Sequence, residues 1–440
     1  MEMKLEVVGR EVIKPASPSP QDLLQLSLAD VSGPAAYVST IFFYKTVSGE
    51  SLDITSGRLK TSLSDTLSRF YPLAGRMEGD KIICNDEGAV FTEARTDLLL
   101  SDFLKNNLDN TNSLPEFLPT IAPGESAGAW PLLSAKVSFF GSGSGFAVTV
   151  SISHRICDAS SILTFVSGWA ATAKAESSDV VVMNIPTFAS TTIYPPPPCS
   201  FQSSSLDGLY EPKSKCVANR FFFKSSKIAE LKRRAMSETV PVPTRVEVIM
   251  SLIWRCATNS SRSNSAVQKS TLMIQALDLR LRIPPAVLSK DAVGNLQAPF
   301  FLKEGSESKM EIAEIVAEFR KAKEVVNEMI KENLATTTLG PNLLSLLGKL
   351  ASELTPDIDL FPMSSWCRKP FYEVDFGCGS PVWIGSTGHV IHNAVFVMLM
   401  DSKDGEDVEA WISLPGQDMS VFVRDQEVLA YAVINPPVLI

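Results

Sequence analysis

The chain has 440 residues, of which 45% are hydrophobic and 20% are charged. This length predicts two or three domains with a large buried core, and it excludes a disulfide-stapled mini-protein. The 40 lysines and arginines against 49 aspartates and glutamates give a net charge of −9, which argues against broad nucleic-acid or anionic-membrane binding. An anionic ligand therefore needs a local basic patch.

Cysteine usage and the charged start of the chain indicate a reduced compartment. The 7 cysteines are scattered and show no paired metal-ligand spacing, so neither a disulfide framework nor a metal site is predicted. Residues 1–15 are rich in charge, unlike a secretory signal, and no apolar run reaches the roughly 18 residues that span a membrane. We expect a cytoplasmic protein.

Apolar periodicity in the first half predicts a mixture of helices and strands. The proline-rich segment 14–20 is expected to be extended, since proline fixes φ and removes a backbone donor. Leucines at helical spacing over 59–67 predict a helix that ends at the turn-like 71–76. Alternating apolar residues at 137–139 and 146–152, separated by a glycine-rich turn, predict a hairpin.

His154 directly follows the second strand of this hairpin, and a helical pattern resumes at Ile162. The histidine therefore lies at a strand-to-helix junction, where a side chain can be both exposed and held rigidly. Asp158 follows four residues later. An imidazole can accept a proton near neutral pH, so His154 is a candidate general base. The same spacing also fits an Asp158 that caps the helix beside an incidental histidine.

The clearest break in composition is a proline- and serine-rich stretch near the middle of the chain, at 194–205. We interpret 194–220 as a linker between an N-terminal domain, 1–193, and a C-terminal domain, 221–440. Apolar patterns of both periods occur in each half, so the fold class is α/β or α+β.

Three common chemistries lack their motifs in this sequence. There is no phosphate-binding loop of the Gly-x-x-x-x-Gly-Lys-Ser/Thr type, and no Gly-x-Gly-x-x-Gly fingerprint follows a strand. A Gly-x-Ser-x-Gly nucleophile elbow is also absent. These absences disfavour nucleotide hydrolysis, dinucleotide-dependent redox chemistry and the α/β-hydrolases.

The remaining motifs resemble one family along nearly the whole chain, the plant BAHD acyl-CoA-dependent acyltransferases. His154 and Asp158 match its His-x-x-x-Asp motif, and 375–379 match its Asp-Phe-Gly-Trp-Gly motif. Three further landmarks occur in the family order: 13–15, 71–76, and Asp278-Leu279-Arg280 with Gly294-Asn295 downstream. Together these five matches are highly specific.

The resemblance implies two domains similar to chloramphenicol acetyltransferase with a solvent channel between them, and part of 360–395 is a candidate to pack with the first domain. It implies that His154 takes the proton of an acceptor hydroxyl as that hydroxyl attacks the thioester, without an acyl-enzyme. The residues that it assigns to structural support of the site are Asp158, Arg280, Asp375, Gly377 and Gly379. In this assignment the carboxylate of Asp158 pairs with Arg280.

Two cysteines and two histidines near the motifs receive simpler interpretations. Cys157 is expected to be a buried filler, as unpaired cysteines commonly are. Cys378 stands where the family usually has tryptophan, which predicts compensating bulk nearby or a wider local cavity. His389 and His392 are expected to be polar loop residues, with a place in the acceptor channel as the alternative.

Acyl-CoA carries phosphates, and a negatively charged protein needs local cations to bind them. A basic stretch at 224–234 and the nearby 244–245 are candidates, although a solvated helix face is the alternative for individual members. The residues predicted to bind CoA are Lys227, Lys232, Arg233, Thr244 and Arg245. By the resemblance, the acceptor pocket is predicted to include Tyr37, Ser39 and Thr40.

The function that the resemblance implies is transfer of an acyl group, preferably acetyl, from acyl-CoA to a hydroxyl of an alkaloid, terpenoid or other alcohol. The Tyr-Phe-Gly-Asn-Cys segment of malonylating relatives is absent. We expect a monomer with no permanently bound cofactor, no metal, and no nucleic-acid or membrane partner. Two alternatives stay open: a non-catalytic relative that binds a metabolite or partner, and a hydrolase that pairs His154 with a serine.

Overall fold

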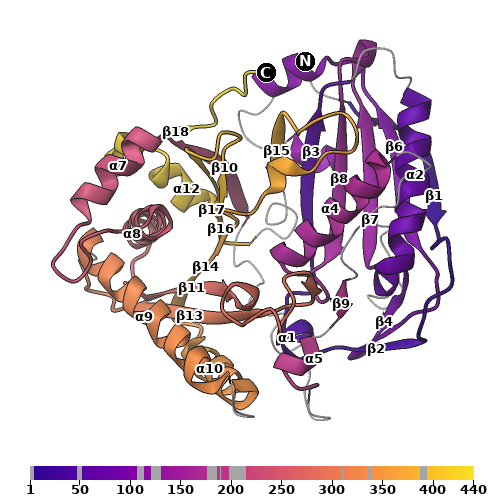
Figure 1. The fold of residues 1–440 in the computed structure, drawn as a ribbon. Coiled ribbons are helices and arrows are strands. Elements are labelled where there is room, and N and C mark those ends of the chain that lie inside the picture. Colours follow the sequence, from indigo (N-terminus) through magenta and orange to yellow (C-terminus); the bar gives the residue numbers. More distant parts are fainter. Residues whose placement is uncertain are drawn as a thin grey trace.

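The computed structural model describes residues 4–46, 52–106, 113–119, 130–175, 186–188, 190–197, 215–309, 311–334, 339–386 and 394–440. Within these ranges the first and second halves of the chain lie side by side, and each is organised around a large sheet with helices packed on it (Figure 1). None of the described helices combines the length and the apolar character needed to cross a membrane.

The first sheet has six described strands in the order β1-β6-β7-β8-β3-β15. These are β1 (Glu6–Ile13), β6 (Ala89–Arg95), β7 (Leu133–Phe139), β8 (Phe146–Ser153), β3 (Tyr37–Tyr44) and β15 (Trp383–Ser386). The predicted hairpin is confirmed, because β7 and β8 pair antiparallel. The described helices of the first half are α1 (Leu28–Val31), α2 (Leu52–Arg69), α3 (Leu100–Asn106), α4 (Ala159–Lys174) and α5 (Ser190–Ile193).

The helix predicted from leucine spacing is α2, and its leucines at 59, 63 and 67 are fully buried. It packs against α4, where the indole nitrogen of Trp169 donates a hydrogen bond to the carbonyl of Leu59 at 3.1 Å. The helix ends before the turn at Tyr71–Ala74, as its sequence predicts. The short strands of this half are β2 (Leu23–Gln25), β4 (Arg76–Glu78), β5 (Lys81–Ile83) and β9 (Thr187–Phe188).

The second sheet has seven described strands in the order β13-β11-β14-β16-β17-β10-β18. They are β13 (Gln297–Glu304), β11 (Ser270–Asp278), β14 (Ile358–Ser365), β16 (Phe396–Asp401), β17 (Val408–Pro415), β10 (Cys216–Phe223) and β18 (Ala432–Ile434). The helices around this sheet are α7 (Ser225–Arg234), α8 (Arg245–Asn264), α9 (Ile312–Asn333), α10 (Leu339–Glu353), α12 (Gly416–Phe422) and α13 (Gln426–Tyr431). Both sheets mix parallel and antiparallel pairs, so the predicted α/β class is confirmed.

Backbone pairing crosses between the halves at several points. β15, from the second half, joins the first sheet by pairing with β3 (Figure 1). β9 pairs in parallel with β12 (Ala292–Val293), and near the C-terminus the Val438 amide donates to the carbonyl of Leu104 at 3.0 Å. Main-chain hydrogen bonds, as well as side-chain contacts, therefore connect the two halves.

A buried ion pair anchors β15 to the second sheet. Arg220 on β10 and Glu409 on β17 lie 2.8 Å apart, and both side chains are almost inaccessible to water. The indole nitrogen of Trp383 on β15 donates to Glu409 at 3.3 Å, and the Arg220 guanidinium lies 5.3 Å from the Trp383 ring. Burial raises the pKa of Glu409, although Arg220 and Trp383 oppose this effect.

The start of α8 is held by a buried carboxylate. Thr244 and Glu247 form a capping box in which each side chain accepts the other's backbone N–H. Arg320 and Lys323, both on α9, also donate to Glu247. Burial by itself would raise the pKa of Glu247, but these donors outweigh it and lower the pKa to about 2.

This arrangement predicts acid-sensitive packing between α8 and α9. Because the folded pKa of Glu247 lies below its ordinary value of 4.5, its stabilising contribution is complete above that pH and is lost as the pH falls toward 2. Glu247→Gln should therefore lower the urea unfolding free energy by on the order of 2 kcal/mol at pH 6, and by less at pH 3. Glu318→Gln, which removes an exposed partner of Lys321 on α9, should change neither value measurably. An equal loss from Glu247→Gln at both pH values would contradict the expectation.

Candidate active site

His154 leaves the end of β8 with its main chain held on both sides. Its amide donates to the carbonyl of Ala36 at 2.8 Å, and its own carbonyl accepts the side-chain amide of Asn295 at 2.7 Å. The side chain is partly exposed, but Nδ1 is buried and has no hydrogen-bond partner among the described residues. Nε2 is thus the ring nitrogen left to meet a substrate.

Asp158 turns away from the histidine and caps α4. It is fully buried, and its Oδ1 accepts the backbone N–H of Ser161 at 2.9 Å. Its two oxygens accept both terminal nitrogens of Arg280, at 2.9 and 3.2 Å, and Oδ2 also accepts the Leu296 amide at 3.1 Å. The helix-cap interpretation is therefore correct for Asp158, and the predicted pairing with Arg280 is present in the structure.

The guanidinium of Arg280 is saturated with acceptors. Nε donates to the Ala292 carbonyl at 2.8 Å, and Nη1 contacts Asp278 at 3.1 Å in addition to Asp158. Burial alone would lower the pKa of Arg280, but the carboxylates of Asp158 and Asp278 raise it. Because Arg280 belongs to the second half and Asp158 to the first, this pair locks the turn after His154 against the opposite half.

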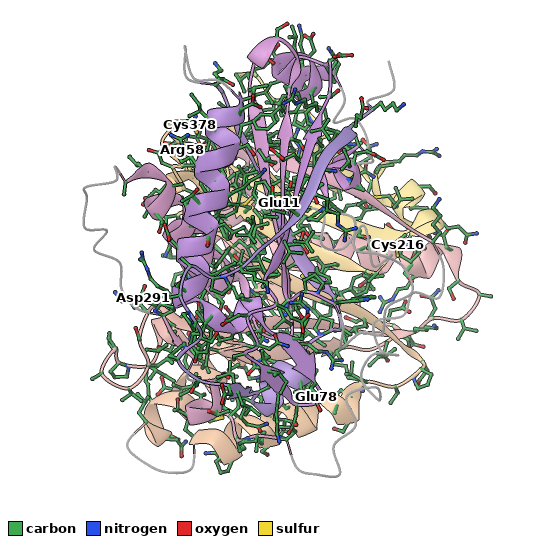
Figure 2. The ribbon with its side chains drawn as sticks, turned by 90° about the vertical axis from the view of Figure 1, so that its right-hand side faces the viewer. Glu11, Arg58, Glu78, Cys216, Asp291 and Cys378 are labelled. Atoms are coloured by element: carbon green, nitrogen blue, oxygen red, sulfur yellow. The ribbon has the colours of Figure 1, made fainter. Side chains whose placement is uncertain are left out.

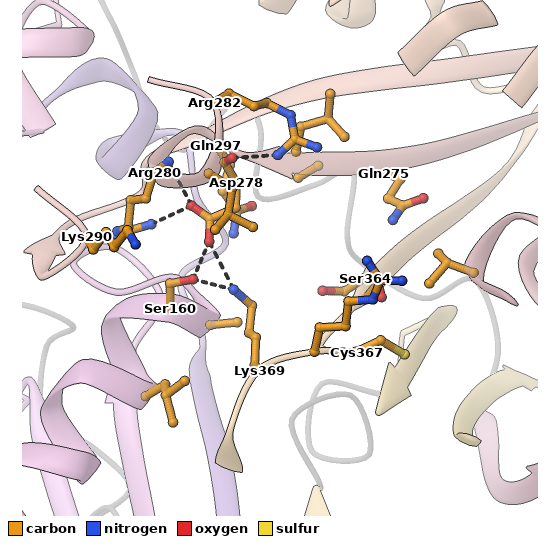
Figure 3. Close-up of a pocket in the computed structure, with 18 of the residues that line it drawn as sticks. Ser160, Gln275, Asp278, Arg280, Arg282, Lys290, Gln297, Ser364, Cys367 and Lys369 are labelled. Atoms are coloured by element: carbon orange, nitrogen blue, oxygen red, sulfur yellow. Dashed lines mark hydrogen bonds and ion pairs between the residues drawn. The ribbon is translucent and has the colours of Figure 1, made fainter. Parts of the chain in front are cut away.

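A cavity of about 740 Å³ opens between the halves beside the Asp158–Arg280 ion pair. It is lined by one face of α4, by the start of α8, by the ends of β11 and β14, and by the segment after β14. Figure 3 shows Ser160, Asp278 and Lys369 converging on its wall, with Lys369 3.0 Å from Asp278. Burial would raise the pKa of Asp278, but Lys369 and Arg280 lower it to about 2.

Most basic side chains that line the cavity already have partners. Arg245 contacts Asp401 at 2.8 Å, and Lys369 is paired with Asp278. Among the described lining residues, Lys290 and Arg368 have side-chain cations without a partner. These two are the cations that remain available to an anionic ligand.

The residues predicted to bind CoA divide into two groups. Thr244 and Arg245 line the cavity, at the start of α8. Lys227, Lys232 and Arg233 lie on α7 and are not among the lining residues, and Lys227 pairs with Glu230 one turn away at 2.9 Å. The solvated-face alternative therefore describes Lys227.

Sequence reasoning missed Lys290 and Arg368 because neither belongs to a dense run of basic residues. The pair Arg368-Lys369, seven and six residues before Asp375, was the available signal. Its meaning depends on the cavity, which brings β14 next to α4 and α8.

The predicted acceptor residues lie on both faces of β3. Tyr37 is opposite Ser153, and Ser39 is opposite Ser151 with their hydroxyls 2.7 Å apart. The Tyr37 hydroxyl donates to the carbonyl of Pro131, and its ring stacks on Trp130. Thr40 points to the other face of the sheet, because side chains alternate along a strand. β3 therefore cannot present all three side chains to one pocket, and Thr40 is separated from the other two.

The second family motif lies at the far end of α4 from His154. Asp375 accepts the amides of Gly377 and Gly379 at 2.9 and 2.7 Å and pairs with Lys174 in the last turn of α4. Both glycines have positive φ, and a Cβ on Gly377 would lie 3.0 Å from the Arg58 guanidinium. The motif is therefore a structural anchor outside the cavity.

Cys378 follows Gly377 and is partly buried against the first core, near Arg58 (Figure 2). Its neighbour Phe376 is fully buried between Tyr44 and Trp169, with ring centroids 5.9 and 5.0 Å away. Phe376 is the phenylalanine of the motif itself, so the compensating bulk or wider cavity expected around Cys378 stays a prediction. Cys157 is fully buried, as expected. His389 and His392 lie outside the described residues.

A family model described as Transferase family matches residues 3–429. BAHD acyltransferase BIA1 of Arabidopsis thaliana is 63% identical to this chain, with both sequences covered completely. The chain belongs to the BAHD acyltransferase family. Minovincinine 19-hydroxy-O-acetyltransferase of Catharanthus roseus is 33% identical, with 98% of each sequence covered. The crystal structure of vinorine synthase matches with a TM-score of 0.80 at 29% identity, covering 97% of this chain and 98% of that one.

Membership confirms the resemblance drawn from the motifs, the two-domain α/β fold and the class of enzyme, an acyl-CoA-dependent acyltransferase. It excludes a fold of the α/β-hydrolase type and agrees with the missing nucleophile elbow. The cavity is lined by Ala159 and Ser160 at the start of α4 and by Arg280 from the second half, and His154 is not among its lining residues.

The Asp158–Arg280 pair predicts a large stability loss on truncation. Asp158→Ala leaves Arg280 buried beside unmatched donors, so the urea unfolding free energy should fall by about 3–5 kcal/mol. Asp53→Ala, which breaks an exposed contact with Arg95, is the matched control and should change it by less than about 0.5 kcal/mol. A loss below about 1 kcal/mol for Asp158→Ala would show that the pair is not a structural lock.

Proposed function

We propose that this BAHD enzyme transfers an acetyl group from acetyl-CoA to a hydroxyl of an alkaloid, terpenoid or similar specialised metabolite, with His154 as general base. The observation that carries the proposal is the setting of His154, which has a clamped main chain, a buried Nδ1 and a partly exposed ring at the junction of the two halves.

In this mechanism Nε2 of His154 accepts the acceptor hydroxyl proton as the oxygen attacks the thioester carbonyl carbon. The carbon–sulfur bond of the resulting tetrahedral intermediate breaks, and the imidazolium returns its proton to the departing CoA thiolate. The products are an ester and free CoA. No protein nucleophile is needed, and burial raises the pKa of the Cys157 thiol well above its ordinary value, which opposes thiolate formation there.

The acceptor class and the donor are supported by relatives. One relative is named for O-acetyl transfer to minovincinine, and others are named for O-acetyl transfer to limonoids. Acetyl-CoA is therefore the donor to test first. We further propose that 1–193 and 221–440 act as the two domains of a cytoplasmic monomer, with part of 360–395, which includes β15, packed on the first domain.

The cavity of about 740 Å³ is the proposed CoA entrance. Its unpaired cations, Lys290 and Arg368, are suited to phosphate oxygens, because a guanidinium or ammonium forms strong charge-assisted hydrogen bonds with them. Tyr37 and Ser39, which share one face of β3, are the residues proposed to contact the acceptor. Thr244 and Arg245, at the start of α8, remain candidates for contacts with CoA.

The role of His154 predicts loss of turnover without loss of fold. A mass-spectrometric screen of acyl-CoAs against pooled plant alcohols identifies a working pair, and free-thiol release then measures the rate. His154→Ala should lower kcat by about 10²- to 10⁴-fold, while its circular dichroism spectrum and thermal midpoint stay near those of the unaltered protein. Near-normal turnover would remove His154 from the mechanism, and a complete absence of thiol release by the unaltered protein would favour the non-catalytic alternative.

The role of the cavity cations predicts a selective effect on CoA binding. Lys290→Ala and Arg368→Ala should each raise the KM for acetyl-CoA by about 10-fold, the loss expected for one charge-assisted hydrogen bond. The KM for acetyl-pantetheine, which carries the same thioester without phosphates, should not change. Lys321→Ala, on the exposed side of α9, serves as a control. An equal rise for both thioesters would contradict phosphate binding by these residues.

A further inference from the structure

A second buried carboxylate lies close to His154, and the family motifs do not include it. Asp30, in α1, is only 1% exposed and has no cationic partner among the described residues. Its oxygens are instead held by neutral donors at 2.6–3.1 Å: the amide and hydroxyl of Ser27, the hydroxyl of Ser190, and the backbone and side-chain amides of Asn295. Five hydrogen bonds therefore converge on one carboxyl group, and they fix its position.

Asn295 connects this carboxylate to the histidine. The residue is 7% exposed, and both its backbone N–H and its Nδ2 donate to Oδ1 of Asp30, at 2.7 and 3.1 Å. The other proton of Nδ2 is donated to the carbonyl of His154 at 2.7 Å. The orientation of the Asn295 amide is thereby determined, because only its nitrogen can serve both acceptors.

The ring of His154 has no comparable support of its own. Nδ1 is buried without a hydrogen-bond partner among the described residues, so no contact there orients the imidazole. The end of α1 is packed tightly against the residue: a Cβ on Gly33 would lie 3.2 Å from the carbonyl oxygens of both Asp30 and His154. The main chain, held by Ala36 on one side and Asn295 on the other, therefore determines where the ring sits.

We propose that Asp30 and Asn295 are positioning residues for His154: the carboxylate orients the Asn295 amide, and this amide holds the histidine carbonyl so that Nε2 faces the acceptor hydroxyl. The inference rests on the proposed role of His154 as base. It assigns to Asn295 an effect on the chemical step and little effect on acyl-CoA binding, because Asn295 is not among the residues that line the cavity.

The test compares two asparagines of equal burial. Asn295→Ala removes the contact with the His154 carbonyl, whereas Asn219→Ala removes an asparagine that is 8% exposed and bonds Asn435 in the second sheet. Misplacement of a reacting group by about 1 Å costs on the order of 10²-fold in rate, so Asn295→Ala should lower kcat by 10- to 100-fold with the KM for acetyl-CoA within about twofold. Asn219→Ala should leave kcat and the KM for acetyl-CoA unchanged, even if it lowers the thermal midpoint as much as Asn295→Ala does.

A spectroscopic readout separates positioning from general destabilisation. With only 3 histidines in the chain, a spectrum of protein labelled with ¹⁵N-histidine is simple, and His154→Ala assigns the signal of interest. Asn295→Ala should shift or broaden the ring signals of His154, and Asn219→Ala should not. Asp30→Asn, which keeps the shape of the side chain and one carbonyl acceptor, should lie between the unaltered protein and Asn295→Ala in kcat.

The outcomes distinguish failure of the positioning role of Asp30 and Asn295 from failure of the proposed role of His154. If His154→Ala abolishes turnover while Asn295→Ala keeps near-normal kcat or unchanged ring signals, positioning by Asn295 is wrong and the role of His154 stands. If Asn219→Ala lowers kcat as much as Asn295→Ala does, the positioning role of Asn295 is also overturned. If His154→Ala itself keeps turnover, the proposed mechanism is wrong, and the positioning role of Asp30 and Asn295 is wrong with it.

Discussion

The ion pair between Asp158 and Arg280 joins the two halves of this acyltransferase at the point where His154 leaves its strand. A carboxylate and a guanidinium buried this deeply are costly to desolvate, and the cost is offset only when each oxygen and nitrogen finds a partner. Here the carboxylate caps α4 and accepts the Leu296 amide, while the guanidinium reaches Ala292, Asp278 and Gly294. The position of the turn after His154 and the cohesion of the halves therefore depend on one satisfied network.

The two buried carboxylates near His154 are stabilised by different physical means. Asp158 is neutralised by a full positive charge, whereas Asp30 is held by the dipoles of hydroxyl and amide groups. Neither carboxylate hydrogen-bonds to the imidazole among the described contacts, so the site differs from a Ser-His-Asp triad, in which an aspartate orients the ring through Nδ1. In the proposed mechanism, the acidic groups shape the loop and leave the proton chemistry to a histidine with one accessible nitrogen.

Helix α4 explains why the two family motifs serve separate purposes. Its 16 residues span about 24 Å, with Asp158 at its start and Lys174, the partner of Asp375, in its last turn. The loop around Asp375 secures the far end of the helix through this ion pair and through the buried Phe376. Cys378 in place of the usual tryptophan is compatible with this anchoring role, because neither the Asp375–Lys174 pair nor the ring contacts of Phe376 use the side chain at 378.

Local patterns in the sequence determined the elements and pointed to the residue proposed as the base. Leucine spacing located α2, alternation located the β7–β8 hairpin, and the motif match singled out His154 and the Asp158–Arg280 partnership, because these signals depend on residues close in sequence or on a family pattern. Only the tertiary structure decided which cations line the cavity, which face of β3 Thr40 occupies and what holds the histidine carbonyl. Those contacts join segments more than a hundred residues apart, as Asn295 and His154 are, and no local periodicity encodes a pairing between side chains that meet only when the two halves close on each other.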